Sequence, residues 1–184
     1  MSREKRRFKN IAKAFHPDTP GYKWAANPKD FILKAEGIAK AADFKERELV
    51  LDIGCGPGFL VQIASHSGAS AFGSDSDDRL FLYYMRKVNG VEKRILIHET
   101  KPAEPLVFDL RFDVITATWI TFGEFWTFEE WSLWLAGVVS GLAPGGRCLL
   151  RFNIETHTSN ADAALLAAGA SEIGELFFRI EGEK

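Results

Sequence analysis

A glycine-rich turn directly after a short apolar segment is the feature that most constrains what this chain can fold into. Residues 49–54 have the pattern of a buried strand, residues 54–58 (GCGPG) form the turn, and a helical pattern begins at Phe59. Glycine allows the backbone to turn sharply and to lie against a ligand, and the first turn of the next helix offers free N–H groups. The segment therefore predicts a floor for a nucleotide-like ligand, with Asp52 placed to favour a positively charged group.

The rest of the chain repeats this alternation of strand and helix patterns. It predicts an α/β fold with a doubly wound, mostly parallel sheet, and 184 residues fit one domain. The predicted strands cover residues 49–54, 69–75, 94–99, 112–118 and 147–153. The predicted helices cover residues 28–43, 58–67, 77–89, 127–141 and 159–168. Residues 171–182 must supply the last strand or strands, and we expect that C-terminal hairpin to be shortened or incomplete.

The first 27 residues differ from the remainder in charge and in pattern. Residues 1–13 hold six Lys and Arg side chains against Glu4, whereas the whole chain has a net charge of −2. Prolines and a glycine break up residues 17–28, so we expect residues 1–27 to form a flexible or loosely packed arm or cap before a domain over residues 28–184. A basic arm can bind nucleic acid, but a solvated terminus is the commoner case and is favoured here.

Four residues of the glycine turn match a known motif. Asp52, Gly54, Gly56 and Gly58 resemble the first motif of the class I S-adenosylmethionine-dependent methyltransferases, an acid followed by Gly-x-Gly-x-Gly. The dinucleotide fingerprint Gly-x-Gly-x-x-Gly needs its third glycine one residue later, where this chain has Phe59. That spacing disfavours an NAD-dependent oxidoreductase. A tight strand–helix turn in another α/β protein is the structural alternative.

The resemblance continues at the ends of the following strands and implies a set of cofactor contacts. Asp75 ends the second strand, where the family has an acid that binds the ribose hydroxyls, and Ser76 or Asp77 is expected to cap the next helix. A Leu-x-Pro-Gly-Gly-Arg turn at 142–147 also matches the family, and Asp113 is expected to have a structural role. The implied cofactor-binding residues are Asp52, Gly54, Cys55, Gly56, Gly58, Asp75, Ser76, Glu99, Thr100, Thr116 and Trp119.

The acceptor pocket is a hypothesis built on aromatic side chains near the same edge. We expect the arm, the segment 119–126 and the loop at 155–157 to cover the cofactor, and the candidate substrate-binding residues are Tyr22, Trp24, Phe122, Phe125 and Trp126. Core packing is the alternative for the aromatic residues before the capping box at 127–130. His16 and His157 are weak candidates for a general base, and either fits an ordinary surface histidine equally well.

The resemblance implies S-adenosylmethionine as the methyl donor, S-adenosylhomocysteine as the product, and transfer to an O, N or C nucleophile, here expected on a small molecule. The alternatives are a cofactor-binding regulatory protein without turnover and an RNA methyltransferase that uses the basic arm. The Asn/Asp-Pro-Pro-aromatic motif of many base methyltransferases does not occur. No cluster has metal-ligand spacing, no membrane segment is expected, and two cysteines in core positions favour a reducing, cytoplasmic location.

Overall fold

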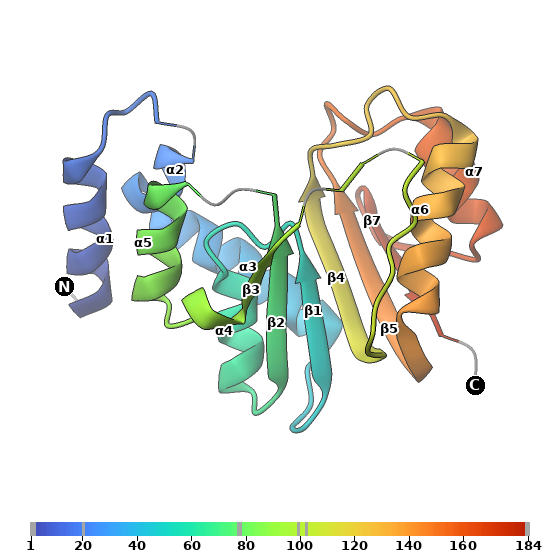
Figure 1. The fold of residues 1–184 in the computed structure, drawn as a ribbon, viewed down its shortest axis with the longest axis horizontal. Coiled ribbons are helices and arrows are strands. Elements are labelled where there is room, and N and C mark those ends of the chain that lie inside the picture. Colours follow the sequence, from blue (N-terminus) through green and yellow to red (C-terminus); the bar gives the residue numbers. More distant parts are fainter. Residues whose placement is uncertain (1–2, 20, 77–78, 99, 102, 183–184) are drawn as a thin grey trace.

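The sheet has seven strands in the order β3-β2-β1-β4-β5-β7-β6 (Figure 1). The computed structural model describes residues 3–19, 21–76, 79–98, 100–101 and 103–182. The strands are β1 (Leu49–Ile53), β2 (Ser70–Asp75), β3 (Ile95–Ile97), β4 (Phe112–Ile120), β5 (Leu142–Phe152), β6 (Ser171–Gly174) and β7 (Phe177–Glu181). Strands β1 to β5 are parallel to one another, whereas β7 runs antiparallel to both β5 and β6.

This topology confirms the predicted fold class, a doubly wound and mostly parallel α/β sheet. The C-terminal hairpin is short but complete, because Leu176 adopts a positive φ of 50° and closes a turn between two strands of four and five residues. The strand order reverses between β1 and β4, which is the point where ligands bind at the carboxyl ends of such sheets.

The helices cover the two faces of the sheet in separate groups (Figure 1). Their bounds are α1 (Arg3–Ala14), α2 (Tyr22–Ala26), α3 (Pro28–Ala42), α4 (Phe59–His66), α5 (Leu80–Val88), α6 (Phe128–Ser140) and α7 (Ser159–Ala167), with a 3₁₀ turn at Glu92–Arg94. Alternate strand residues point to opposite faces. Val50 and Val114 pack in one core cluster with α1, α3, α4 and α5, and Leu51 and Ile115 pack in another with α6 and α7.

The N-terminal residues are helical, which the sequence analysis did not predict. In α1, Phe8 is only 3% exposed and meets Phe59 of α4 edge to face, with ring centroids 5.8 Å apart. Just after α1, Phe15 contacts Phe81 of α5 in the same way, at 5.1 Å. The expectation of a flexible or loosely packed arm is therefore wrong for these residues, because aromatic side chains on one side of a basic helix reach the core.

Two local predictions hold. The capping box of α6 is present, with the Glu130 N–H donating to Thr127 Oγ1 at 3.2 Å and the Thr127 N–H donating to Glu130 Oε2 at 2.8 Å. Asp113 has the expected structural role, since its Oδ2 accepts from the Leu49 N–H at 2.7 Å and joins the starts of β4 and β1. Every helix in the described part of the chain is too short or too polar to cross a membrane.

Replacing Phe8 by Ala should lower the free energy of unfolding by about 3 kcal/mol, because it removes a buried ring and leaves a cavity between α1 and α4. Urea unfolding followed by circular dichroism measures this change. The matched control is Lys9→Ala on the exposed side of the same helix, which should change the stability by less than about 0.5 kcal/mol. Equal stabilities of the two variants would show that α1 does not pack as described.

Candidate functional site

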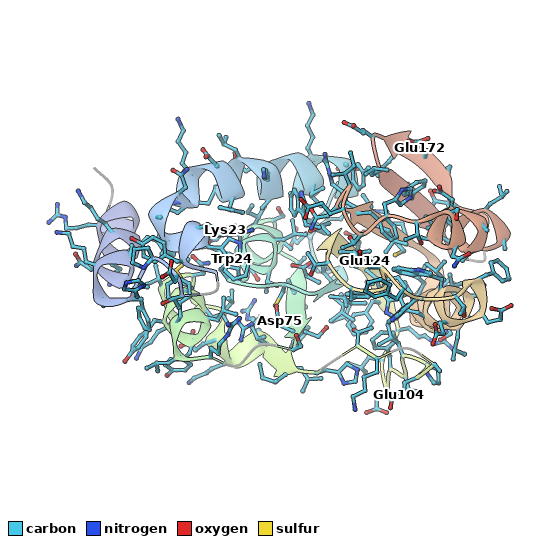
Figure 2. All side chains as sticks on the ribbon, turned by 90° about the horizontal axis from the view of Figure 1, so that it is seen from above. Lys23, Trp24, Asp75, Glu104, Glu124 and Glu172 are labelled. Carbon is cyan, nitrogen blue, oxygen red and sulfur yellow. The ribbon has the colours of Figure 1, made fainter. Side chains whose placement is uncertain are left out.

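A cleft of about 760 Å³ opens at the carboxyl ends of β1, β2 and β4. Its volume lies within the range of about 300–1,000 Å³ that is typical of small-molecule sites. Figure 2 looks down on this end of the sheet, with Lys23 and Trp24 on α2 and Asp75 at the end of β2. The lining residues are Lys23, Trp24, Phe31, Lys34, Ala35, Asp52, Ile53, Gly54, Cys55, Gly56, Pro57, Phe59, Leu60, Ser74, Asp75, Ser76, His98, Thr100, Thr118, Trp119, Thr121, Phe122 and Asn153.

The glycine loop between β1 and α4 forms the floor of the cleft. Gly54, Gly56 and Gly58 all have positive φ angles, of 71°, 51° and 77°. At Gly58 an added Cβ would also lie 2.5 Å from Val91 Cγ2, so a side chain there would clash as well as strain the backbone. The glycines therefore let bare backbone face the cleft.

Two side chains from neighbouring elements hold the Gly56 peptide. Asp75 Oδ2 accepts a hydrogen bond from the Gly56 N–H at 2.6 Å, and Arg86 Nε donates to the Gly56 carbonyl at 2.9 Å. Arg86 Nη2 also lies 3.6 Å from Asp75 Oδ2, and Arg86 is 4% exposed. One residue pair thus fixes both polar groups of Gly56, and Asn89 Nδ2 adds a hydrogen bond to the Pro57 carbonyl at 2.8 Å.

Asp52 brings a buried carboxyl group to the wall of the cleft. Its side chain is 4% exposed, and Oδ1 accepts a hydrogen bond from Thr116 Oγ1 at 2.8 Å. Burial raises the pKa of Asp52 to about 7, the Thr116 hydroxyl opposes that shift, and the nearby charge of Asp75 adds to it. Near neutral pH this carboxyl group is therefore poised between its neutral and charged forms, and a cation placed beside it would favour the charged form.

The N-terminal helices and the end of β4 form the opposite side of the cleft. Trp24 of α2 meets Phe31 of α3 edge to face at 6.4 Å, and the Trp24 ring lies above Gly56. Lys34 of α3 lies over the Phe31 ring at 5.4 Å and over the Trp119 ring at 5.8 Å. Trp119 has a positive φ of 54°, and Asn153 Nδ2 donates to its carbonyl at 3.4 Å.

The structure brings most of the predicted cofactor-binding residues to this cleft. Asp52, Gly54, Cys55, Gly56, Asp75, Ser76, Thr100 and Trp119 line it. Thr116 is fully buried behind Asp52, and Gly58 shapes the loop without lining the cleft. Glu99 lies outside the described residues. Ser76 does not cap α5, because that helix begins at Leu80 with Arg79 at the N-cap position, and Asp77 also lies outside the described residues.

Of the five predicted acceptor-binding residues, two line the cleft and three do not. Trp24 and Phe122 line the cleft, whereas Tyr22, Phe125 and Trp126 do not. Tyr22 packs against the core cluster under α1, Phe125 is 89% exposed, and Trp126 is buried against Trp131 with ring centroids 4.9 Å apart. For Trp126 the core-packing alternative is therefore the better description.

Neither predicted histidine lies in the cleft. His16 is exposed beside Asp18, with Nδ1 and Oδ2 3.2 Å apart. The His157 ring stacks on the Phe178 ring, and His157 Nε2 lies 2.9 Å from Asp162 Oδ1. His98 is exposed and lines the cleft after β3. Among the described residues, no group of three or more His, Cys, Asp or Glu side chains could hold a metal ion.

Arg86, Lys23, Phe31 and Lys34 were missed by sequence reasoning. Arg86 carried a usable signal, since it lies four residues after Leu82 on the apolar face of α5 and a buried guanidinium needs partners. Phe31 and Lys34 are three residues apart and so share one face of α3. Nothing in the sequence indicated that this face would meet the glycine loop.

Comparison with solved structures identifies relatives in fold. DesVI from Streptomyces venezuelae has a TM-score of 0.67 and 15% identity, covering 92% of this chain and 99% of that one. The magnesium protoporphyrin IX methyltransferase of Synechocystis, solved with bound SAM, has a TM-score of 0.63 and 16% identity over 99% and 92%. A TehB-like SAM-dependent methyltransferase from Corynebacterium glutamicum has a TM-score of 0.57 and 17% identity over 97% and 95%.

These likenesses confirm the resemblance to the class I methyltransferases at the level of the fold. They cover nearly the whole of each chain, so the similarity extends over the N-terminal helices as well as the sheet. No protein-family model matches the sequence, and no curated protein matches it significantly.

Replacing Asp52 by Asn should stabilise the ligand-free protein at pH 8 by up to about 4 kcal/mol, because the amide carries no buried charge. The Asp52 carboxyl group lowers the stability of the wild type progressively as the pH rises from about 4, where the unfolded carboxyl ionises, to about 7, where the folded one does. The advantage of the variant should therefore shrink as the pH falls through this window. Urea unfolding at a series of pH values measures it.

The control for this experiment is Asp109→Asn, which changes an exposed carboxylate and should leave the pH dependence as in the wild type. A wild type and an Asp52→Asn variant with the same stability at every pH would contradict the raised pKa of Asp52.

Proposed function

We propose that this protein binds S-adenosylmethionine in the cleft and transfers its methyl group to a small molecule. The observation that carries the proposal is the glycine loop, which Asp75 and Arg86 hold in place by hydrogen bonds. Its bare backbone faces the cleft, and the buried carboxyl group of Asp52 lies beside it. An adenosyl amino acid needs both features, because its sugar and its α-amino group must be bound at neighbouring points.

The two ends of the cleft suit the two ends of the cofactor. Asp75 at the end of β2, and Ser76 directly after it, line the part of the cleft where the ribose would bind. His98 and Thr100 line the part where the adenine would bind. Asp52 lies by the glycine loop, where the positively charged amino-acid part would bind. Because burial raises the pKa of the Asp52 carboxyl to about 7, a bound ammonium group would promote its ionisation and release part of a proton near neutral pH.

When bound, S-adenosylmethionine supplies an electrophilic methyl group on a sulfonium. The residues of this chain would then have to align the acceptor and exclude water. We place the acceptor at the side of the cleft formed by α3, the end of β4 and the segment after it, where Phe31, Trp119 and Phe122 provide ring surfaces. No histidine among the described lining residues lies on that side, so we propose that alignment, rather than a histidine base, makes the main contribution. The acceptor nucleophile is O, N or C.

A small-molecule acceptor fits the described surface better than RNA. The exposed basic side chains of α1, such as Arg6 and Arg7, do not line the cleft, and α1 is held against α4 by the contact between Phe8 and Phe59. We also propose a cytoplasmic location, because Cys55 and Cys148 are free thiols buried in separate core clusters, as suits a reducing compartment.

Titration calorimetry with S-adenosylmethionine, S-adenosylhomocysteine and NAD tests the cofactor. We expect heats of association with the first two and none with NAD. Asp75→Asn should weaken S-adenosylhomocysteine binding by about tenfold or more, since it removes the charge that faces Arg86 and the ribose site. Asp109→Asn, at an exposed site away from the cleft, is the control. An absence of heat with either adenosyl compound at millimolar concentration would reject the proposal.

Methyl transfer is tested separately, by incubating the protein with labelled S-adenosylmethionine and a panel of small-molecule acceptors. Labelled product that requires the folded protein supports an enzyme. Tight binding without turnover on any acceptor would instead support a regulatory protein that binds the cofactor.

A further inference from the structure

The acceptor side of the cleft carries positive charge that the described residues do not neutralise. Lys34 of α3 lines the cleft and stands over the rings of Phe31 and Trp119. Lys23 of α2 also lines the cleft. The ion pairs of the described residues include neither lysine. Among the described lining residues, the carboxyl groups belong to Asp52 and Asp75, at the ends of β1 and β2.

Besides Lys34, a second cation lies close to the Trp119 ring. The guanidinium of Arg151, at the end of β5, lies 5.7 Å from the Trp119 ring, while the Lys34 ammonium lies 5.8 Å from it. A ring with two cations near it is a costly place for a cationic or strongly electron-poor acceptor and a favourable one for an anion. The positive charge at Trp119 therefore comes from two elements, α3 and β5.

Ring faces surround the same place. Phe31 and Trp119 line the cleft next to Lys34, Phe122 lines it three residues after Trp119, and Trp24 meets Phe31 edge to face. Flat apolar surfaces select planar apolar ligands, and a nearby ammonium selects an anionic substituent on them. Asn153 also lines the cleft, and its hydrogen bond to the Trp119 carbonyl supports the positive φ of the Trp119 backbone.

We propose that the methyl acceptor is a planar aromatic molecule with an anionic group, and that Lys34 binds this group. The inference rests on the proposed function and names the substrate class of the same site. The ammonium of Lys34 donates hydrogen bonds to a carboxylate or phosphate of the acceptor, while the rings of Trp119 and Phe122 hold its planar body. Lys34 is thus a specificity-determining residue.

The test measures the dissociation constants of paired probes by calorimetry, with and without saturating S-adenosylhomocysteine. The anionic probes are 4-hydroxybenzoate, 6-hydroxy-2-naphthoate and phenyl phosphate, and the neutral partners are the two matching amides. We expect the better carboxylate to bind about tenfold more tightly than its amide, as for a hydrogen bond to a charged group. The phosphate probe decides which anion is preferred, and either preference supports the proposal.

Lys34→Gln should reduce the acid-to-amide ratio to about one, and Lys34→Arg should retain it, because the charge is what discriminates. Lys40→Gln, at an exposed lysine on the same helix that does not line the cleft, should behave as the wild type. Thermal unfolding of each variant confirms that it is folded. The preference for the anion should also weaken in high salt.

Three results would overturn the inference. The first is a wild type that binds acid and amide equally, or binds none of the probes. The second is an anion preference that survives in Lys34→Gln. The third is a loss of S-adenosylhomocysteine affinity in Lys34→Gln as large as the loss of acid affinity, which would assign the lysine to the cofactor. Failure of the wild type to bind S-adenosylhomocysteine would reject the proposed function instead. The titrations without that compound still measure the anion preference in that case.

Discussion

The Gly56 peptide, held between Asp75 and Arg86, is the contact on which the site depends. A loop that offers bare backbone to a ligand has no side chains of its own to keep it in place, so its shape must come from neighbouring elements. Here the carboxylate at the end of β2 binds the N–H, and a guanidinium from α5 binds the carbonyl. The same carboxylate faces Arg86, which limits the cost of burying an arginine beneath the loop.

This arrangement also sets the electrostatics of the cleft. Asp75 supports the loop, and its charge helps to raise the pKa of the buried Asp52 carboxyl. The β1–β2 end of the cleft is therefore suited to a cation, while Lys34 and Arg151 beside Trp119 make the other end suited to an anion. A cleft with opposite charge preferences at its ends orients two different ligands, because each would be disfavoured in the place of the other.

Local patterns predicted the parts of the fold and the site that depend on adjacent residues. The glycine turn, Asp75 at the end of β2 and the capping box of α6 each needed only their own sequence neighbours. The role of Asp113 followed from its place in a strand that matched a family. The C-terminal hairpin was expected to be shortened or incomplete, and it is complete because one non-glycine residue, Leu176, accepts a left-handed conformation.

What escaped prediction depends on tertiary contacts. The α1 helix looked like a solvated basic terminus because its charges outnumber its apolar residues, yet Phe8 is buried against Phe59 of α4. Aromatic residues before α6 carried no sign of which would face the cleft. The rings of Phe122 and Trp126 contact each other and both contact Trp131, yet of the two only Phe122 lines the cleft. Arg86 and Lys34 act on residues far away in the chain, and no periodic pattern encodes such partners.

The position of β7 has a consequence for biosynthesis. It lies between β5 and β6 in space but follows both in the chain, so it is the last of the seven strands to leave the ribosome. Until residues 177–181 emerge, the nascent chain exposes the outer edge of β5 with its backbone groups unpaired, and such an edge readily pairs with other strands. The sheet is thus completed only when this strand is inserted, and until then the unpaired edge of β5 is a place where aggregation can start.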